Sequence, residues 1–224
     1  MLVARAASSI YPVTGIDTDS GYIALADWRR QIAEIYADVR RLAVKDVAGA
    51  LSHWRFARER LYREHPQSPV PAAARPGFRA VHFLHDPSLR FELRVALDRE
   101  SGANAARLPA SAGEGLAFSR IGWVDVPFPT GERRLAVYWL VGYTGGLFLP
   151  FRDKTSGQET YAAGRYLLDT AKSADLGSDP ARGTLVLDFN FAYQPSCAFD
   201  AKWACPLAPS ENWLDIPIRA GERL

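Results

Sequence analysis

Two hydrophobic periodicities divide this chain, and the boundary between them constrains the fold more than any other feature. Up to about residue 64, apolar residues recur at three- and four-residue steps, which is typical of amphipathic helices. The segment HPQSPVP (65–71) then places three prolines where a helix cannot continue. Beyond Pro76, apolar and polar residues alternate in short runs between turn residues, which indicates antiparallel strands.

The helical part is predicted to contain two helices, over residues 20–44 and about 50–64. Their apolar residues are Leu25, Trp28, Ile32, Ile35, Tyr36, Val39 and Leu42 in the first, and Leu51, Trp54, Phe56, Ala57 and Leu61 in the second. We therefore expect residues 1–49 to form an N-terminal extension with an amphipathic helix. Because such a stripe is rarely left in water, we expect it to be buried on the protein's own sheet or in a homodimer contact, with the dimer preferred.

The remainder, residues 50–224, is expected to be a single mainly-β domain. Seven runs rich in Val, Phe, Tyr and Trp predict strands: 78–84, 90–97, 115–124, 133–143, 147–150, 184–191 and 213–221. Strands and helices do not alternate, which disfavours a doubly wound parallel sheet. The predicted fold class is α+β and mainly β, with two N-terminal helices followed by an antiparallel β-sandwich or small β-barrel.

Composition excludes several classes of protein. With 27 basic and 25 acidic residues the net charge is +2, and the concentrated basic face of a nucleic-acid-binding protein is missing. No run approaches the roughly 18 to 20 apolar residues of a membrane span, so no membrane partner is expected. The first fifteen residues lack the apolar stretch of a secretory signal, which favours the cytoplasm. Cys197 and Cys205 are then expected to be reduced thiols.

Familiar catalytic and binding motifs are missing. The glycine clusters YTGGLF and TSGQET lack the spacing that cradles phosphates. No G-x-S-x-G surrounds Ser156, so its hydroxyl more plausibly bonds its own turn than acts as a nucleophile. Cys197 and Cys205 stand too far apart for the close cysteine pair of a structural zinc site. A zinc site with histidines is the less favoured alternative, and no metal or cofactor is expected.

The segment FRDKTSGQETYAAGRYLLD (151–169) concentrates an unusual amount of polar chemistry. Elsewhere, Glu211 and Glu222 stand among aromatic residues and prolines, as Glu159 and Asp188 also do. Burial raises the pKa of a carboxyl group unless a cation or amide donors compensate, and Arg165 is the candidate cation. These residues therefore predict either general acid–base chemistry or a buried Arg–carboxylate pair that only locks loops together.

Two longer strings resemble a known family. D-x-T-S-G-x-E-T-Y-x-x-G-R-Y, from Asp153, and D-F-N-x-A-Y followed by two cysteines, from Asp188, are similar to the bacterial and archaeal domain of unknown function 1684 family. The upstream HWRFARERLYREHPQSPVP resembles the same family, so the resemblance covers about residues 50–224. It implies no activity, because the family has none assigned. The chain departs from the family pattern at Gln194, Ser196, Phe199 and Asp200.

Three polar loops, around residues 65–69, 151–166 and 188–212, are expected to converge at one end of the sheets, where loops commonly carry binding groups. The catalytic candidates are Glu159 and Asp188, and the binding candidates are Arg165, Tyr161, Tyr193, Asn190, Asp153, Ser156, Gln67, Ser68 and Asn212. The leading hypothesis is a pocket for a small polar or anionic organic molecule, with general acid–base catalysis as an option. The alternative is a non-catalytic structural or protein-interaction module whose polar motifs only knit loops together.

Overall fold

Two helices open the structure. The computed structural model describes residues 21–98, 105–111, 115–143 and 145–224. Helix α1 spans Gly21–Ala43 and α2 spans Val47–Glu64, so both predicted helices are present within a few residues of their expected bounds. Residues 1–20 of the predicted N-terminal extension lie outside the described part.

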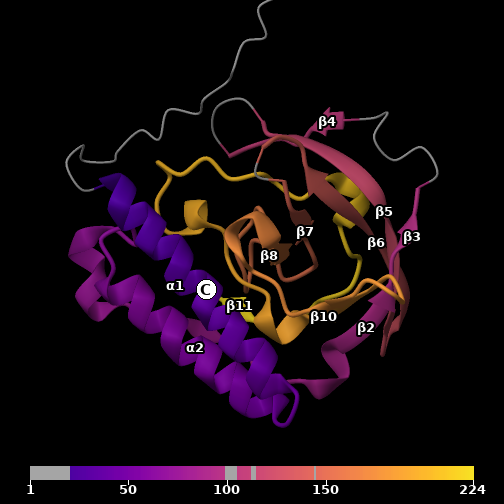
Figure 1. Cartoon of the computed structure of the whole chain (residues 1–224), viewed down its shortest axis with the longest axis horizontal. Coiled ribbons are helices and arrows are strands. Elements are labelled where there is room, and N and C mark those ends of the chain that lie inside the picture. The colour runs from indigo at the N-terminus through magenta and orange to yellow at the C-terminus, as the bar shows by residue number, and fades with distance from the viewer. Residues whose placement is uncertain (1–20, 99–104, 112–114, 144) are drawn as a thin grey trace, which may run out of the picture.

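The two helices pack against each other along one side of the molecule (Figure 1). Asp46 ends the connection between them, and its carboxylate accepts a hydrogen bond from the Gly49 backbone N–H at 2.9 Å, which caps α2. Tyr36 and Val39 of α1 are buried together with Trp54 of α2. Much of the apolar stripe of α1 is therefore covered within the chain itself.

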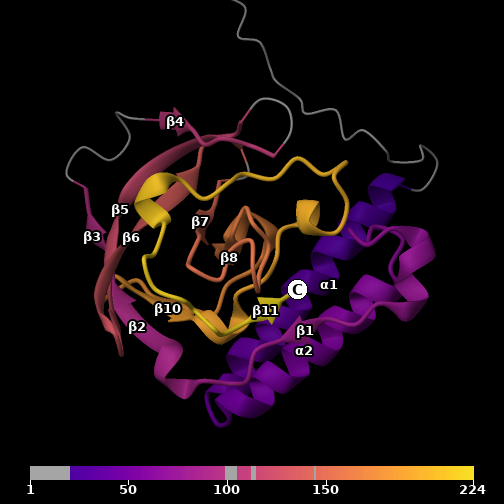
Figure 2. The ribbon, with the colours of Figure 1, turned by 180° about the vertical axis from the view of Figure 1, so that it is seen from behind.

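Eleven short and long strands follow in the described residues. Their bounds are β1 Val81–His82, β2 Arg90–Arg94, β3 Ala96–Leu97, β4 Ala105–Arg107, β5 Ala117–Phe128, β6 Gly131–Leu140, β7 Leu147–Phe151, β8 Arg165–Asp169, β9 Ser178–Asp179, β10 Thr184–Asp188 and β11 Glu222–Arg223. They form antiparallel sheets in the orders β3-β5-β6-β7-β8, with β4 beside β5, then β2-β10-β9, and β1-β11. Figure 2 shows the β1 and β11 pair lying next to the helices.

Short 3-10 helices lie before and between several of these strands. They span Ala72–Gly77, Pro87–Leu89, Thr170–Lys172, Phe189–Phe191, Ser196–Ala198 and Ser210–Asn212. The long β5–β6 hairpin turns between Phe128 and Gly131, whose φ of +111° favours glycine. On the opposite edge of β5, a side chain at Gly122 would place its Cβ 2.3 Å from the Ala96 carbonyl oxygen. Only glycine therefore lets β3 pair there.

The main hydrophobic core lies between the six-stranded sheet and the sheet of β2 and β10. Leu135 and Leu149 contribute from the first sheet and Leu187 from the second, and each is fully buried. The predicted fold class, α+β and mainly β with two N-terminal helices, is confirmed. Among the described residues the sheets stay open and do not close into a barrel. None of the helices described is long and apolar enough to cross a membrane.

Several segments differ from the predicted strands: only 81–82 of 78–84 pair, 189–191 form a 3-10 turn, and β4 and β9 were not predicted. Two further differences lie close to the polar segments. Residues 165–169 form β8, although the sequence predicts no strand there and places residues 165 and 166 in the polar loop 151–166. RYLLD is buried on both faces and therefore shows no alternation. Residues 213–221, expected to be a strand, are extended but only bridge neighbouring loops, for example at the Arg152–Trp213 bridge. Pro217 lacks a backbone N–H, which removes one donor that a ladder would need.

Candidate functional site

The polar segment 151–164 is held by hydrogen bonds among its own residues. One oxygen of Asp153 accepts hydrogen bonds from the Thr155 backbone N–H, at 2.6 Å, and from the Thr155 hydroxyl. The Thr155 and Thr160 hydroxyls lie 2.9 Å apart. The Ser156 hydroxyl accepts from the Asp153 backbone N–H at 3.2 Å, as its predicted turn requires. Gly157 supplies the positive φ, +85°, at the tip of the turn.

Arg165, the first residue of β8, joins this turn to the C-terminal segment, and its side chain is 1% exposed. Its Nη2 donates to Asp153 Oδ2 and to the Ile218 carbonyl, both at 2.7 Å, while its Nη1 donates to the Ala220 carbonyl and, at 3.1 Å, to the Glu222 carbonyl. We call this group the Arg165 clasp. Burial lowers the pKa of Arg165 and the nearby Asp153 carboxylate opposes that shift.

A second buried ion pair extends the clasp to α2. Arg58 donates from Nε to Glu222 Oε1 at 2.5 Å and from Nη2 to Oε2 at 3.2 Å, and the Gln194 backbone N–H adds a third bond at 2.8 Å. The guanidinium of Arg58 lies 4.2 Å from the ring centre of Tyr62 and 4.7 Å from that of Tyr193. Tyr193, a predicted binding residue, therefore packs against an internal cation.

The sequence analysis did not propose Arg58 as a site residue. A signal was present, because Arg58 falls at helical spacing on the same stripe as Leu51, Trp54 and Leu61. A lone Arg on an apolar helix face demands a buried carboxylate partner. Glu222 is that partner, and 164 residues separate the two.

Asp188 and Asn190 form a separate polar cluster at the end of β10. Asp188 accepts from the Asn190 backbone and side-chain nitrogens, at 3.0 and 2.8 Å, and from Arg90 Nη1 at 3.1 Å. Asn190 in turn bonds both the backbone N–H and the carbonyl of Asp86, at 2.9 and 2.8 Å. Both predicted residues are fully buried and serve to hold the chain before β2 against the end of β10.

Asn212 fills a gap in the main sheet. Strands β6 and β7 pair only at Tyr138–Phe148 and Trp139–Leu147. Further along, the Asn212 side chain accepts from the Ala136 N–H at 2.7 Å and donates to the carbonyls of Ala136 and Pro150, at 3.0 and 2.8 Å. Its amide thus replaces the missing backbone partner between the two strands.

The other predicted residues lie elsewhere. Glu159 is partly exposed and binds Arg219, whose Nε lies 3.0 and 3.1 Å from the two carboxylate oxygens, and this bond lowers the pKa of Glu159. Tyr161 lies beside Cys197, and burial together with that thiol raises its pKa to about 12. The Ser68 hydroxyl donates to the Tyr62 carbonyl at 2.5 Å.

Gln67 closes the loop after α2 by donating from Nε2 to the Gly21 carbonyl at 3.2 Å, at the start of α1. The structure therefore brings Asp153, Ser156 and Arg165 together directly. It connects Tyr193 to them through the Arg58–Glu222 pair, and it distributes the remaining predicted residues over separate contacts.

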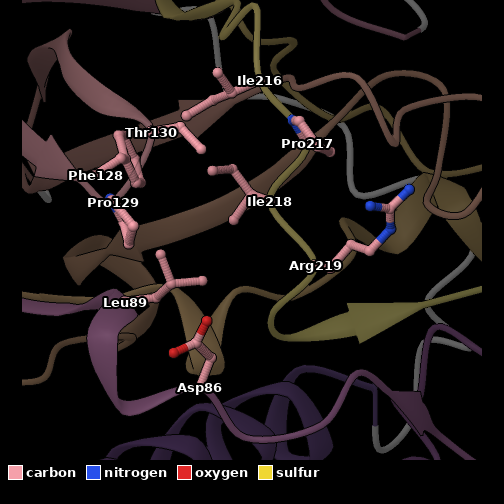
Figure 3. A pocket seen from close by; sticks show the side chains of 9 residues that line it. All are labelled: Asp86, Leu89, Phe128, Pro129, Thr130, Ile216, Pro217, Ile218 and Arg219. Carbon is pink, nitrogen blue, oxygen red and sulfur yellow. The ribbon is translucent and has the colours of Figure 1, made fainter.

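A shallow hollow of about 200 Å³ opens near the clasp (Figure 3). It is lined by Asp86, Leu89, Phe128, Pro129, Thr130, Ile216, Pro217, Ile218 and Arg219. None of the predicted site residues lines it, although Asp86 and Arg219 are hydrogen-bonded to two of them. In Figure 3 the Arg219 guanidinium points away from the apolar lining, so Asp86 is the charged group nearest to it.

Fold and polar network together define an α+β protein, mainly β, whose C-terminal segment is fastened by buried arginines. Comparison with known proteins gives the family. The sequence profile described as "Protein of unknown function (DUF1684)" matches residues 77–223, and the chain belongs to this family.

A solved structure is also similar. It is the solution NMR structure of an uncharacterized protein of Haloarcula marismortui, 31% identical to this chain. The match covers 81% of this chain and 96% of that one, with a TM-score of 0.60. No curated protein matches the chain.

Proposed function

We propose that the chain is a non-catalytic structural or interaction module, in which the polar motif holds loops, α2 and the C-terminal segment in one arrangement. The observation that carries this proposal is that most N–H donors of the Arg165 guanidinium already bond acceptors within the chain. A guanidinium has five N–H donors, and four of those of Arg165 are directed at Asp153 and three backbone carbonyls. Few donors remain for an anionic ligand.

The two carboxylates considered for proton transfer support the same proposal. A general acid or base works best with a pKa near the operating pH. The Arg219 hydrogen bonds lower the pKa of Glu159, which keeps that carboxylate ionised and paired. Asp188 is fully buried and accepts three hydrogen bonds from Asn190 and Arg90.

A ligand screen that compares the wild type with Glu159→Gln tests the proposal, because Glu159 is partly exposed and its replacement should leave the protein folded. Thermal melts of the full chain would be measured with a panel of dicarboxylates, amino acids and sugar phosphates. We expect no compound whose stabilising effect depends on Glu159. A compound that raises the melting temperature of the wild type and of Asp215→Asn, but not of Glu159→Gln, would contradict the proposal. Asp215 is the matched control, because it is an exposed carboxylate paired with Arg133.

Binding of a small polar or anionic molecule is the second candidate, and the hollow of Figure 3 is the observation that favours it. An apolar floor with one carboxylate suits a small molecule with an apolar body and a polar group that reaches Asp86. Compounds from the same panel should then lose their effect in Thr130→Trp, which would fill the hollow. Retention of the effect in that variant would refute binding there.

A homodimer through the N-terminal helix and a cytoplasmic location remain proposals. Tyr22 and Ile23, 67% and 76% exposed at the start of α1, are the apolar residues left for such a contact. The location rests on the sequence, whose two cysteines are too few for the disulfide framework of a small secreted domain. Sedimentation of the full chain should give a dimer and that of Ile23→Glu a monomer. A monomeric full chain would refute the dimer.

A further inference from the structure

Cys197 and Cys205 form a cluster that the clasp does not use. Cys197 lies in the 3-10 turn Ser196–Ala198, and its backbone N–H donates to Cys205 Sγ at 3.3 Å. The two thiols also interact with each other, and each shifts the pKa of the other. Both are free, with exposed fractions of 7% and 4%. The 3.3 Å contact places Cys205 Sγ next to the backbone of Cys197, and the loop 198–204 links the two residues.

Hydroxyl groups and a cation surround the pair. The Ser111 hydroxyl accepts a hydrogen bond from the Cys205 backbone N–H at 2.9 Å and donates to the Trp203 carbonyl at 3.0 Å. Tyr161 lies beside Cys197, and the Lys172 ammonium, 3.3 Å from Asp169, lies near Cys205. The Cys205 thiol, together with the Ser111 and Tyr161 hydroxyls, lowers the pKa of Cys197 to about 6. The neighbouring Cys197 thiolate, together with burial, raises the pKa of Cys205. Because Cys197 ionises more readily than Cys205, Cys197 is the thiol of the pair that would attack first.

We propose that Cys197 and Cys205 form a redox-active dithiol that exchanges with small disulfides, with Cys197 attacking and Cys205 resolving. The Cys197 thiolate attacks one sulfur of a disulfide RSSR, forming a Cys197–SR bond and releasing RS⁻. Cys205 then loses its proton to solvent and attacks Cys197 Sγ, forming the internal disulfide and releasing the second RS⁻. Both cysteines are oxidised while one RSSR is reduced to two thiols, so the exchange is stoichiometric.

The bond would close the loop 198–204, which touches the helical side of the molecule. Phe199 lies 5.4 Å from Tyr62 of α2 between ring centres, and Trp203 Nε1 donates to the Pro69 carbonyl at 3.3 Å. Formation of the disulfide would therefore change how the loop 198–204 packs against α2 and the segment after it.

Glutathione disulfide is a suitable probe for the reduced full chain. Wild type should end with an internal disulfide and no attached glutathione, as measured by intact mass and peptide mapping. Cys205→Ser should stop with one glutathione on Cys197. Failure of both thiols to react in the native protein, while both react after denaturation, would overturn the proposal. Accumulation of glutathione on Cys205 in Cys197→Ser, with none on Cys197 in Cys205→Ser, would overturn the assigned roles.

The pH dependence of alkylation by iodoacetamide gives a second readout that survives poor folding of a serine variant. A lowered pKa raises the thiolate fraction at neutral pH but weakens each thiolate as a nucleophile, so the net gain in rate is only a few-fold. The midpoint of the profile is the sharper measure and should lie near 6 for Cys197. Tyr161→Phe should move it upward, whereas Tyr22→Phe, on the helix, should not. An unshifted midpoint in Tyr161→Phe would contradict the proposal.

Discussion

Replacement of Arg165 by alanine tests the clasp most directly. The change removes the partner of Asp153, whose side chain is fully buried, and leaves the carbonyls of Ile218, Ala220 and Glu222 without their donor. Breaking a buried ion pair from one side costs about 3–5 kcal/mol, because the remaining charge is uncompensated. For a chain of this size, each kcal/mol lowers the melting temperature by about 2–4 °C. The expected fall is therefore about 6–20 °C.

Urea and thermal unfolding of five variants, namely Arg165→Ala, Arg165→Lys, Asp153→Ala, the double Arg165→Ala with Asp153→Ala, and Arg134→Ala, would measure this. Arg165→Lys should rescue poorly, since a single ammonium cannot reach four acceptors in a fixed fork. Adding Asp153→Ala to Arg165→Ala should cost less than the sum of the single changes, because it removes the uncompensated charge. Arg134→Ala is the control: its partner Asp125 and its own side chain are exposed, so the loss should stay within about 1 kcal/mol. A melting temperature of Arg165→Ala within a degree or two of wild type would refute the reasoning.

Three further predictions concern other buried groups. Asn212→Asp should cost about 2–6 kcal/mol in urea unfolding, because an acceptor would face the carbonyls of Ala136 and Pro150; a loss under about 0.5 kcal/mol would contradict this. Burial lowers the pKa of His82 from 6.5 to about 4, so the unfolded chain binds more protons between these values. Stability should fall by about 2–3 kcal/mol as the pH drops through that window, and His82→Phe should flatten the fall; an identical profile would count against it. Elemental analysis of untagged protein, prepared under reducing conditions, should show no stoichiometric zinc, and about one zinc per chain would overturn that expectation.

The sequence by itself determined those helices and strands in which buried residues recur at helical spacing or in alternation. Helices α1 and α2 followed from apolar residues at helical spacing and from the prolines after Glu64. The long hairpin of β5 and β6 followed from alternation. Strand β8 was missed because a strand buried on both faces has no period to read. The segment 213–221 was misread because alternation records which side chains are buried and says nothing of whether the backbone finds a partner.

For the site, the residue types predicted a buried Arg–carboxylate pair as one of two alternatives. Arg165 and Asp153 form such a pair. The contacts that occupy the rest of Arg165 could not be read in the same way. Its other partners are backbone carbonyls more than fifty residues away, at Ile218, Ala220 and Glu222. Every residue carries a carbonyl, so no side chain marks the ones that will be used. Only the path of the C-terminal segment past β8 selects them, and that path depends on the packing of the whole fold.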